Sequence, residues 1–211
     1  DDGEDTDSRE ACRLEGFDVV INATYAHYNL KLMRRALEAG CHYLDLGGVF
    51  HTTAEQLKLD PEFKAAGLTA ILCMGACPGV SNILAAHGAE KLDRCDEVRI
   101  RVGSKRGADF SGFNMSPQTL IAEFTRNPYV YENGDWRELQ PLSGRESFHL
   151  PEPIGEVEGF YCIHSEVLTL PKSIAGVKRV TYQVSFPAAV MNMMDVLLDL
   201  KLLDPEPFSI T

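Results

Sequence analysis

The stretch from Asp18 to Gly48 constrains the fold of this chain more than any other part of the sequence. It opens with a Val- and Ile-rich run at 18–23 that shows no polar alternation, a pattern typical of a strand buried on both faces. Apolar residues then recur at helical spacing as far as Gly40, a residue that favours the end of a helix. A second short apolar run at 41–46 follows. The pattern predicts a strand–helix–strand unit of a parallel sheet.

Polar side chains follow both predicted strands. Asn22, Thr24, Tyr25 and His27 come after the first strand, and Asp45 ends the second. Because ligands of open parallel sheets lie beyond the carboxyl ends of the strands, we expect a cofactor or substrate near these residues. Asp45 either anchors a substrate amine or assists proton transfer, or alternatively it caps the turn that follows it. His27 is expected to start a helix, and Tyr25 either stacks on a ring or fills a gap.

The first half of such a sheet is missing from the sequence. The chain begins with the acidic run DDGEDTDSRE, and no glycine-rich phosphate loop precedes the strand at 18–23. We therefore expect 1–77 to be the C-terminal half of a dinucleotide-binding domain and the chain to be a fragment that is inactive alone. The expected elements after Gly48 are helices at 52–58, 61–66 and 80–92 and a strand at 69–73.

The pattern changes beyond residue 93. Alternating polar and apolar residues predict strands, and Asn133-Gly134 predicts a hairpin within 129–139. Ser116 and Pro117 predict the start of a helix that runs to residue 126. The stretch 141–153 is expected to be rich in loops. The further strands expected are 97–106, 156–164 and 178–186, and a final apolar helix is expected at 188–203.

These elements predict an α/β chain in three parts. Residues 1–77 are the parallel remnant, 78–187 form an α+β domain with a mixed sheet, and 188–211 hold a helix that packs back on the chain or lies at a subunit interface. The net charge of −11 argues against a nucleic-acid surface. No apolar run approaches the roughly 18 residues that span a membrane. The six cysteines form no CxxC pair, so we expect reduced thiols, a cytoplasmic location and no metal site.

Several segments together resemble the saccharopine dehydrogenase family, with lysine 6-dehydrogenase-like members closest. They are the stretch from Asp18 to Leu46, then GACPGVSNILA, PLSGRE and HSEVLTLP. The resemblance implies a Rossmann domain followed by a substrate and dimerisation domain. It also implies oxidation or reduction of a C–N centre of a lysine or saccharopine type of substrate, with NAD or NADP as the cofactor. Both cofactors stay open.

The resemblance also implies positions for the cofactor. The segment along the nicotinamide corresponds to Asn22, Ala23 and Thr24, with Tyr25 beside it, and Asp45 lies near the substrate. Several members carry an Asp where this chain has Cys77, so a substrate amine must be bound differently here if that Asp contacts it. The loop that closes the nicotinamide pocket corresponds to Ala76, Cys77, Pro78, Gly79 and Asn82.

Three residues of the second domain complete the predicted site. His164 and Glu166 form an acid/base pair or, alternatively, a surface ion pair at a strand end; two residues apart on a strand, they point the same way. Arg145 holds a substrate carboxylate through a bidentate contact or is a solvated loop arginine.

Two other functions remain open from the sequence. The chain is a non-catalytic NAD(P)-binding or dimerisation module, or a polyamine-forming relative of the carboxynorspermidine or homospermidine synthase type. The partners expected are a small amino-acid substrate and a second copy of the chain, because exposed strand edges and apolar faces tend to be covered.

Overall fold

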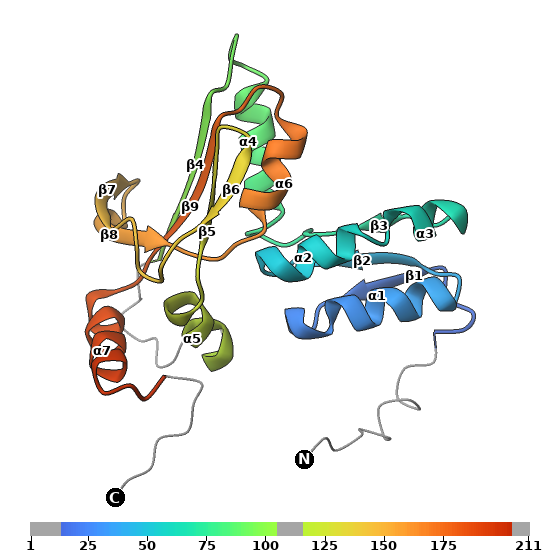
Figure 1. Ribbon diagram of the computed structural model, residues 1–211, viewed down its shortest axis with the longest axis horizontal. Helices are drawn as coiled ribbons and strands as arrows, with labels where there is room; N and C mark the ends of the chain where they lie inside the picture. The colour runs from blue at the N-terminus through green and yellow to red at the C-terminus, as the bar shows by residue number, and fades with distance from the viewer. Residues whose placement is uncertain (1–13, 105–115, 204–211) are drawn as a thin grey trace, which may run out of the picture. The chain divides into compact units, whose positions relative to one another are not determined.

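The computed structural model describes residues 14–104 and 116–203, and the acidic run at the start of the sequence lies outside them (Figure 1). The chain divides into two compact units, Asp1–Leu84 and Ala85–Thr211, which are described separately below. The division falls within helix α4 (Val80–Ala89), a few residues after the boundary expected at residue 77.

Unit 1 contains a three-stranded parallel sheet in the order β1-β2-β3. Asn22 lies opposite Asp45 in the register, so the carboxyl ends of β1 and β2 are level. This is the predicted strand–helix–strand unit with one further strand. Its strands are β1 (Val19–Asn22), β2 (His42–Asp45) and β3 (Ala70–Ile71), and its helices are η1 (Ala26–Tyr28), α1 (Asn29–Glu38), α2 (Phe50–Leu57) and α3 (Asp60–Ala65).

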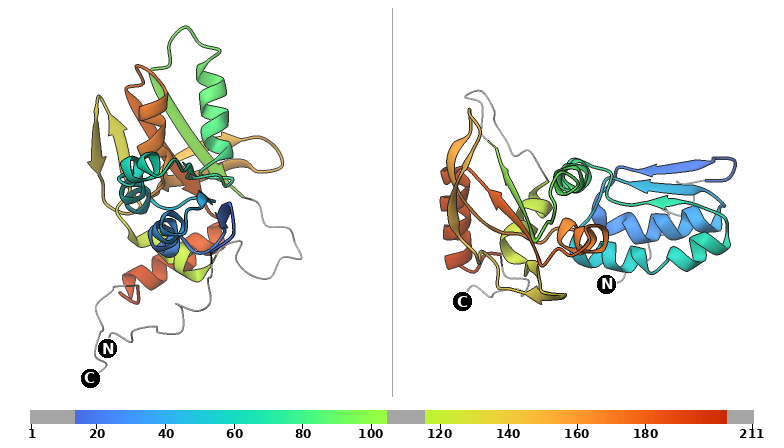
Figure 2. Two further views of the ribbon diagram at one scale, coloured as in Figure 1. Left: turned by 90° about the vertical axis from the view of Figure 1, so that its right-hand side faces the viewer. Right: turned by 90° about the horizontal axis from the view of Figure 1, so that it is seen from above.

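The helices α1, α2 and α3 all lie on one face of this sheet (Figure 2). Met33, Ala36, Tyr43, Leu59 and Phe63 form the buried core between the helices and that face. On the other face, the alternate strand residues Val19, Ile21 and Ile71 are exposed. The prediction that the first strand is buried on both faces was therefore wrong for the described residues, because the described helices cover only one of its two sides.

Unit 2 is built on a mixed sheet, as predicted. The order is β6-β5-β9-β8-β7, and β4 pairs with β9 in parallel. The central strand β9 is buried from Val180 to Ser185 because it has neighbours along both edges. The strands are β4 (Glu97–Gly103), β5 (Tyr129–Glu132), β6 (Asp135–Glu138), β7 (Glu146–Leu150), β8 (Gly155–Tyr161) and β9 (Arg179–Ser185).

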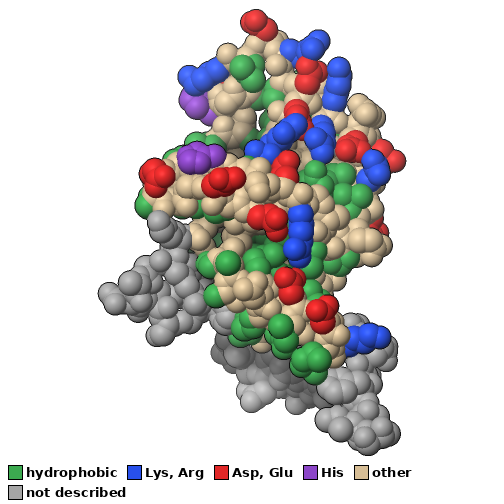
Figure 3. Space-filling model, turned by 90° about the vertical axis from the view of Figure 1, so that its left-hand side faces the viewer, with side chains coloured by type: hydrophobic (Ala, Val, Ile, Leu, Met, Phe, Trp, Pro, Cys, Tyr) green, Lys and Arg blue, Asp and Glu red, His purple; other side chains and the backbone are tan. Residues whose placement is uncertain are grey.

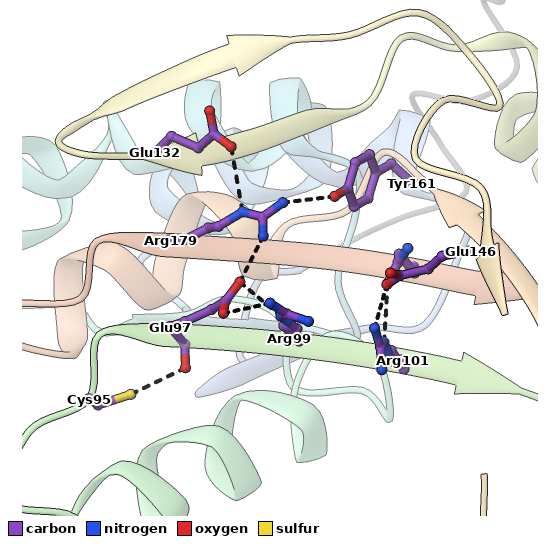
Figure 4. A network of polar contacts seen from close by, with 9 residues as sticks. Cys95, Glu97, Arg99, Arg101, Glu132, Glu146, Tyr161 and Arg179 are labelled. Atoms are coloured by element: carbon purple, nitrogen blue, oxygen red, sulfur yellow. Dashed lines mark hydrogen bonds and ion pairs between the residues drawn. The ribbon is translucent and has the colours of Figure 1, made fainter. Parts of the chain in front are cut away.

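The two faces of this sheet differ in character. One face packs strand residues such as Val98, Tyr131 and Val180 against apolar side chains of α4 and α6 (Glu166–Ser173). The other carries Glu97, Arg99 and Arg101 of β4 and Arg179 of β9. Glu97 pairs with Arg99 and Arg179, and Arg101 pairs with Glu146 (Figure 4). Charges of both signs are also interspersed on the face drawn in Figure 3.

The remaining helices are α5 (Pro117–Thr125) and α7 (Ala188–Asp199). The Ser116 side chain accepts a hydrogen bond from the backbone N–H of Thr119 at 3.1 Å, which confirms the predicted helix start. Two predictions were wrong. The loop-rich stretch 141–153 contains β7, and the strand expected to reach residue 164 ends at Tyr161, followed by helix α6. In the part of the chain that the structure describes, we find no helix with the length and apolar character to span a membrane.

Candidate functional site

A group of buried polar residues lies at the carboxyl ends of β1 and β2. We call this group the strand-end cluster; its members are Asn22, Asn29, Tyr43, Asp45 and Gln56. The Asn22 amide donates to Asn29 Oδ1 at 2.9 Å and to the Tyr43 hydroxyl at 3.0 Å. Burial raises the pKa of Tyr43, which keeps this hydroxyl protonated, and it donates to the Asn29 carbonyl oxygen at 3.2 Å. The cluster ties β1, β2 and α1 together below the predicted cofactor edge.

Asp45 holds the end of β2 to the segment after β3. Its Oδ1 accepts hydrogen bonds from the backbone N–H of Gly47 at 2.9 Å and of Cys73 at 2.8 Å. Its Oδ2 accepts from Gln56 Nε2 at 2.7 Å, and the residue is 1% exposed. These are the contacts of the capping alternative. The role of Asp45 toward a substrate amine stays a prediction.

The loop from Gly75 to Gly79 packs on the turn after β2. A Cβ at Gly75 would lie 2.3 Å from the Leu46 carbonyl oxygen, and a Cβ at Gly79 would lie 2.1 Å from the Gly75 carbonyl oxygen. Asn82 Oδ1 accepts from the Gly79 backbone N–H at 3.1 Å. Close backbone packing therefore explains both glycines, and Asn82 stabilises the loop from within α4.

Some of the predicted cofactor residues are buried and others are exposed. Asn22, Pro78 and Gly79 are buried, whereas Ala23, Thr24, Tyr25, Ala76 and Cys77 are exposed. The exposed residues follow β1 and β3, on either side of the end of β2 in the sheet order. The contact of these residues with a nicotinamide stays a prediction. The residues described contain no glycine-rich loop for the phosphate half.

Unit 2 brings His164 and Glu166 together. The His164 Nδ1 atom contacts Glu166 Oε2, and the side chains are 12% and 0% exposed. The surface ion pair weighed from the sequence was therefore wrong. The strand geometry assumed for the pair was wrong too, because Glu166 begins α6, where the helix dipole favours a carboxylate. The His164 ring stacks on Tyr182 with centroids 3.8 Å apart.

Sequence reasoning missed two titratable neighbours of this pair. Glu123 Oε2, carried by α5, contacts the Cys162 thiol, and Cys162 lies two residues before His164. Burial raises the pKa of Glu123, and the charge of His164 opposes this. Burial, together with the nearby Glu123, raises the pKa of Cys162 well above its ordinary value. The sequence contained one signal for Glu123, because it is a charged residue between Leu120 and Phe124 on the apolar side of the helix.

Arg145 lies in the loop before β7. Its guanidinium faces Asp195 at 3.4 Å and Glu158 at 3.8 Å, and the side chain is 40% exposed. Its carboxylate partners in this structure therefore come from the chain itself. Its predicted contact with a substrate carboxylate stays a prediction.

Comparison with known proteins shows which protein family the chain resembles. Residues 2–71 match the family model of the saccharopine dehydrogenase NADP binding domain. This part of the chain therefore resembles the NADP-binding domain of the saccharopine dehydrogenase family. The family match includes Asn22, Asp45 and Gln56 of the strand-end cluster and makes unit 1 part of an NAD(P)-binding domain.

Relatives of the saccharopine dehydrogenase family extend the similarity into unit 2. Carboxyaminopropylagmatine dehydrogenase of Synechocystis sp. is 31% identical over 192 residues, which are 86% of this chain and 48% of that protein. Carboxynorspermidine synthase of Vibrio alginolyticus is 27% identical over 207 residues, 92% of this chain and 49% of that protein. The chain thus spans about half the length of the curated relatives it matches.

A solved structure of the saccharopine dehydrogenase family has the same fold. The apo saccharopine dehydrogenase (L-Glu forming) of Saccharomyces cerevisiae superposes with a TM-score of 0.65 at 14% identity, covering 89% of this chain and 44% of that one. This confirms the α/β fold class, with a Rossmann-like parallel sheet and a separate mixed sheet. The expectation that lysine 6-dehydrogenase-like members are closest stays a prediction.

Proposed function

We propose that this chain is part of an NAD(P)-dependent oxidoreductase that acts on the C–N bond of a carboxylated polyamine. The observation that carries the proposal is the buried His164–Glu166 pair, which is suited to moving a proton at an amine nitrogen. The names of the relatives favour the polyamine-type alternative over the lysine or saccharopine type. The net charge of −11 fits a cationic substrate as well, because opposite charges raise association rates.

Unit 1 provides exposed residues that would flank the cofactor and buried residues that support them. Thr24, Tyr25, Ala76 and Cys77 would flank the nicotinamide, whose chemistry when bound is to accept or deliver hydride. The strand-end cluster supports these exposed residues because its hydrogen bonds join α1 to the ends of β1 and β2. NAD and NADP are both compatible with these residues.

Unit 2 provides the proton chemistry. Glu166 accepts a hydrogen bond from His164 Nδ1, which orients the ring and assigns Nε2 as the atom that takes a proton from the substrate nitrogen or returns it. The stack on Tyr182 holds the ring plane.

The experiment that tests this proposal is a substrate panel. The full-length protein that carries this chain is assayed for NAD(P)H formation from carboxynorspermidine, carboxyaminopropylagmatine, saccharopine and lysine, with products identified by mass spectrometry. We expect turnover of a carboxylated polyamine at least tenfold above the two amino acids. Preferential turnover of lysine or saccharopine would return the function to the amino-acid class. Tight NAD(P) binding without turnover of any amine would support the non-catalytic module instead.

We also propose that the protein forms a homodimer in the cytoplasm. Helix α7 exposes Met193 and Val196, and Leu200 is exposed at its C-cap, so the apolar surface there is open to a partner. No disulfide joins the described cysteines, as in a reducing compartment. Light scattering should give twice the monomer mass, and Val196→Glu should shift it toward the monomer. A monomer at high concentration would contradict the dimer.

A further inference from the structure

Unit 1 contains a cavity on the helix side of its sheet, and none of the residues predicted to flank the cofactor lines it. Its volume is about 290 Å³, and its walls come from α1, α2, α3 and the segment around β3. We propose that this cavity binds a small neutral aromatic molecule whose hydroxyl group donates a hydrogen bond to Gln56 Oε1. The inference is independent of the proposed amine chemistry.

The amide oxygen of Gln56 is the buried polar atom that a ligand could satisfy. Gln56 lines the cavity and is 0% exposed. Its Nε2 atom donates to Asp45 Oδ2 at 2.7 Å, whereas its Oε1 atom has no hydrogen-bond partner among the residues that the structure describes. Turning the amide over would set its oxygen against a carboxylate oxygen, which is a contact of two acceptors. A buried acceptor without a donor is destabilising, so this position favours a ligand that supplies one.

The walls of the cavity are largely apolar. Met33 and Phe63 are buried members of the core of unit 1. Leu68, Ala70 and Leu72 line the cavity as well, and they pack against that core while staying only partly buried. A phenyl ring and a thioether both make favourable contacts with a flat aromatic ring. The walls therefore suit an aromatic body, with the hydrogen bond made at one of its substituents.

One side of the cavity is open to solvent. Asp60 and Lys64 line it and form an ion pair at 2.6 Å, with side chains that are 57% and 74% exposed. A small molecule can therefore enter without moving the buried core. The two charges are of opposite sign and already paired, so this opening selects neither an anion nor a cation. A neutral ligand follows from this balance.

The size of the cavity favours a ligand over a water molecule alone. A water can donate to Gln56 Oε1, but it takes up only about 30 Å³ and makes no use of the apolar walls. An engineered apolar cavity of roughly 150 Å³ is sufficient to bind benzene. The volume of about 290 Å³ here therefore accommodates a substituted ring. The hydroxyl group of such a ring would take the place of the water at Oε1.

The test compares two probes by fluorine NMR in the full-length protein: 4-fluorophenol, and 4-fluorotoluene, which has a methyl group in place of the hydroxyl. We expect the phenol to bind with a Kd about three- to tenfold lower, because only its hydroxyl can donate to Gln56 Oε1. An apolar cavity without an acceptor would prefer the methyl compound. Because Met33 lines the cavity, its methyl NMR signal should shift when the phenol binds.

Three results of this comparison would overturn the inference. They are equal or tighter binding of 4-fluorotoluene, failure of both probes to bind, which would leave only water in the cavity, and a signal change that spares Met33.

Variants separate the amide oxygen from the cavity around it. Gln56→Met removes the acceptor, so the phenol should lose its advantage over 4-fluorotoluene. Ala70→Leu fills the cavity while Gln56 stays in place, and it should abolish the binding of both probes. Ile71→Val, at the next residue on the exposed face of the sheet, is the matched control and should leave both Kd values unchanged.

The inference fails if Gln56→Met keeps the preference for the phenol or if Ala70→Leu keeps the native affinity. If loss of the donor to Asp45 prevents Gln56→Met from folding, Ala70→Leu decides. Because none of these readouts needs turnover, a failed substrate panel would leave their result standing.

Discussion

The strand-end cluster of unit 1 and the residues around His164 in unit 2 both contain buried carboxyl groups, but their hydrogen-bond donors differ. Asp45 accepts from two backbone N–H groups and an amide, none of which titrates. Glu123 and Glu166 contact a thiol and an imidazole, which do titrate. Burial alone therefore does not identify an acid/base carboxyl. The chemical nature of the donors separates a structural carboxylate from one that exchanges protons.

The largest effect on stability is expected at Asp45. Asp45→Ala would leave the N–H groups of Gly47 and Cys73 and the Gln56 amide without their acceptor, and should lower the free energy of unfolding by about 3–5 kcal/mol. Urea denaturation measures this. Asp60→Ala, which removes an exposed ion pair with Lys64, should cost under about 1 kcal/mol. If Asp45→Ala kept native stability and lost only turnover, the assignment of Asp45 as a structural carboxylate would be wrong.

The largest effect on activity is expected at His164. His164→Asn should lower kcat by about 10²–10⁴-fold, because the group that moves the proton is lost. The free energy of unfolding should change much less than in Asp45→Ala. His149→Asn, on the exposed side of β7, serves as the control and should retain native kcat. An unchanged kcat in His164→Asn would remove the His164–Glu166 pair from the reaction.

A smaller loss of stability is expected in the loop that packs on the strand-end cluster. Gly79 has a φ of +130°, and an added Cβ would clash with the Gly75 carbonyl oxygen. Gly79→Ala should therefore cost roughly 2–3 kcal/mol. Gly88, inside α4, has no atom within 4 Å of an added Cβ, so Gly88→Ala should be neutral or stabilise by about 0.5–1 kcal/mol. Equal effects of the two changes in urea denaturation would contradict the strain argument.

The smallest effect is a pH dependence of stability. The pKa of Glu123 is raised in the folded protein, so its contribution to stability is full below its ordinary value of 4.5 and is lost as the pH rises through the raised value. Glu123→Gln should therefore gain stability relative to the native protein as the pH increases from 4.5. Urea denaturation over a series of pH values gives this difference. A difference that stays constant with pH would mean that Glu123 does not titrate differently on folding.

Local signals in the sequence predicted much of the fold. Gly40 adopts a φ of +73° after α1, and Asn133 and Gly134 have positive φ angles in the β5–β6 hairpin. These features depend on a few adjacent residues, which the sequence displays directly. Helix α6 was missed because Pro171 lies inside it and the Ser165 side chain makes no capping hydrogen bond.

The contacts of the candidate site were harder to predict because they are not local. Cys73 is 28 residues from Asp45, and Cys162 is 39 residues from Glu123. No periodicity joins such pairs, so only the folded chain shows that Asp45 is surrounded by neutral donors and Glu123 by titratable groups. The identities of Asp45, His164 and Glu166 were visible in the sequence, whereas the partners that distinguish their roles were not.

The polar network on the sheet of unit 2 has a consequence for the charge of that surface. Glu97 bonds to Arg99 at 2.8 Å and to Arg179 at 2.9 Å, and Glu132 and Glu146 complete a set of three acids against three arginines (Figure 4). The hydrogen bond from Arg99 lowers the pKa of Glu97, so the acid stays ionised. A single change of Glu97 to Gln would remove a carboxylate partner from Arg99 and from Arg179, and Arg179 would keep its contact with Glu132. The change would make this surface more positive by one charge and favour its contact with anions.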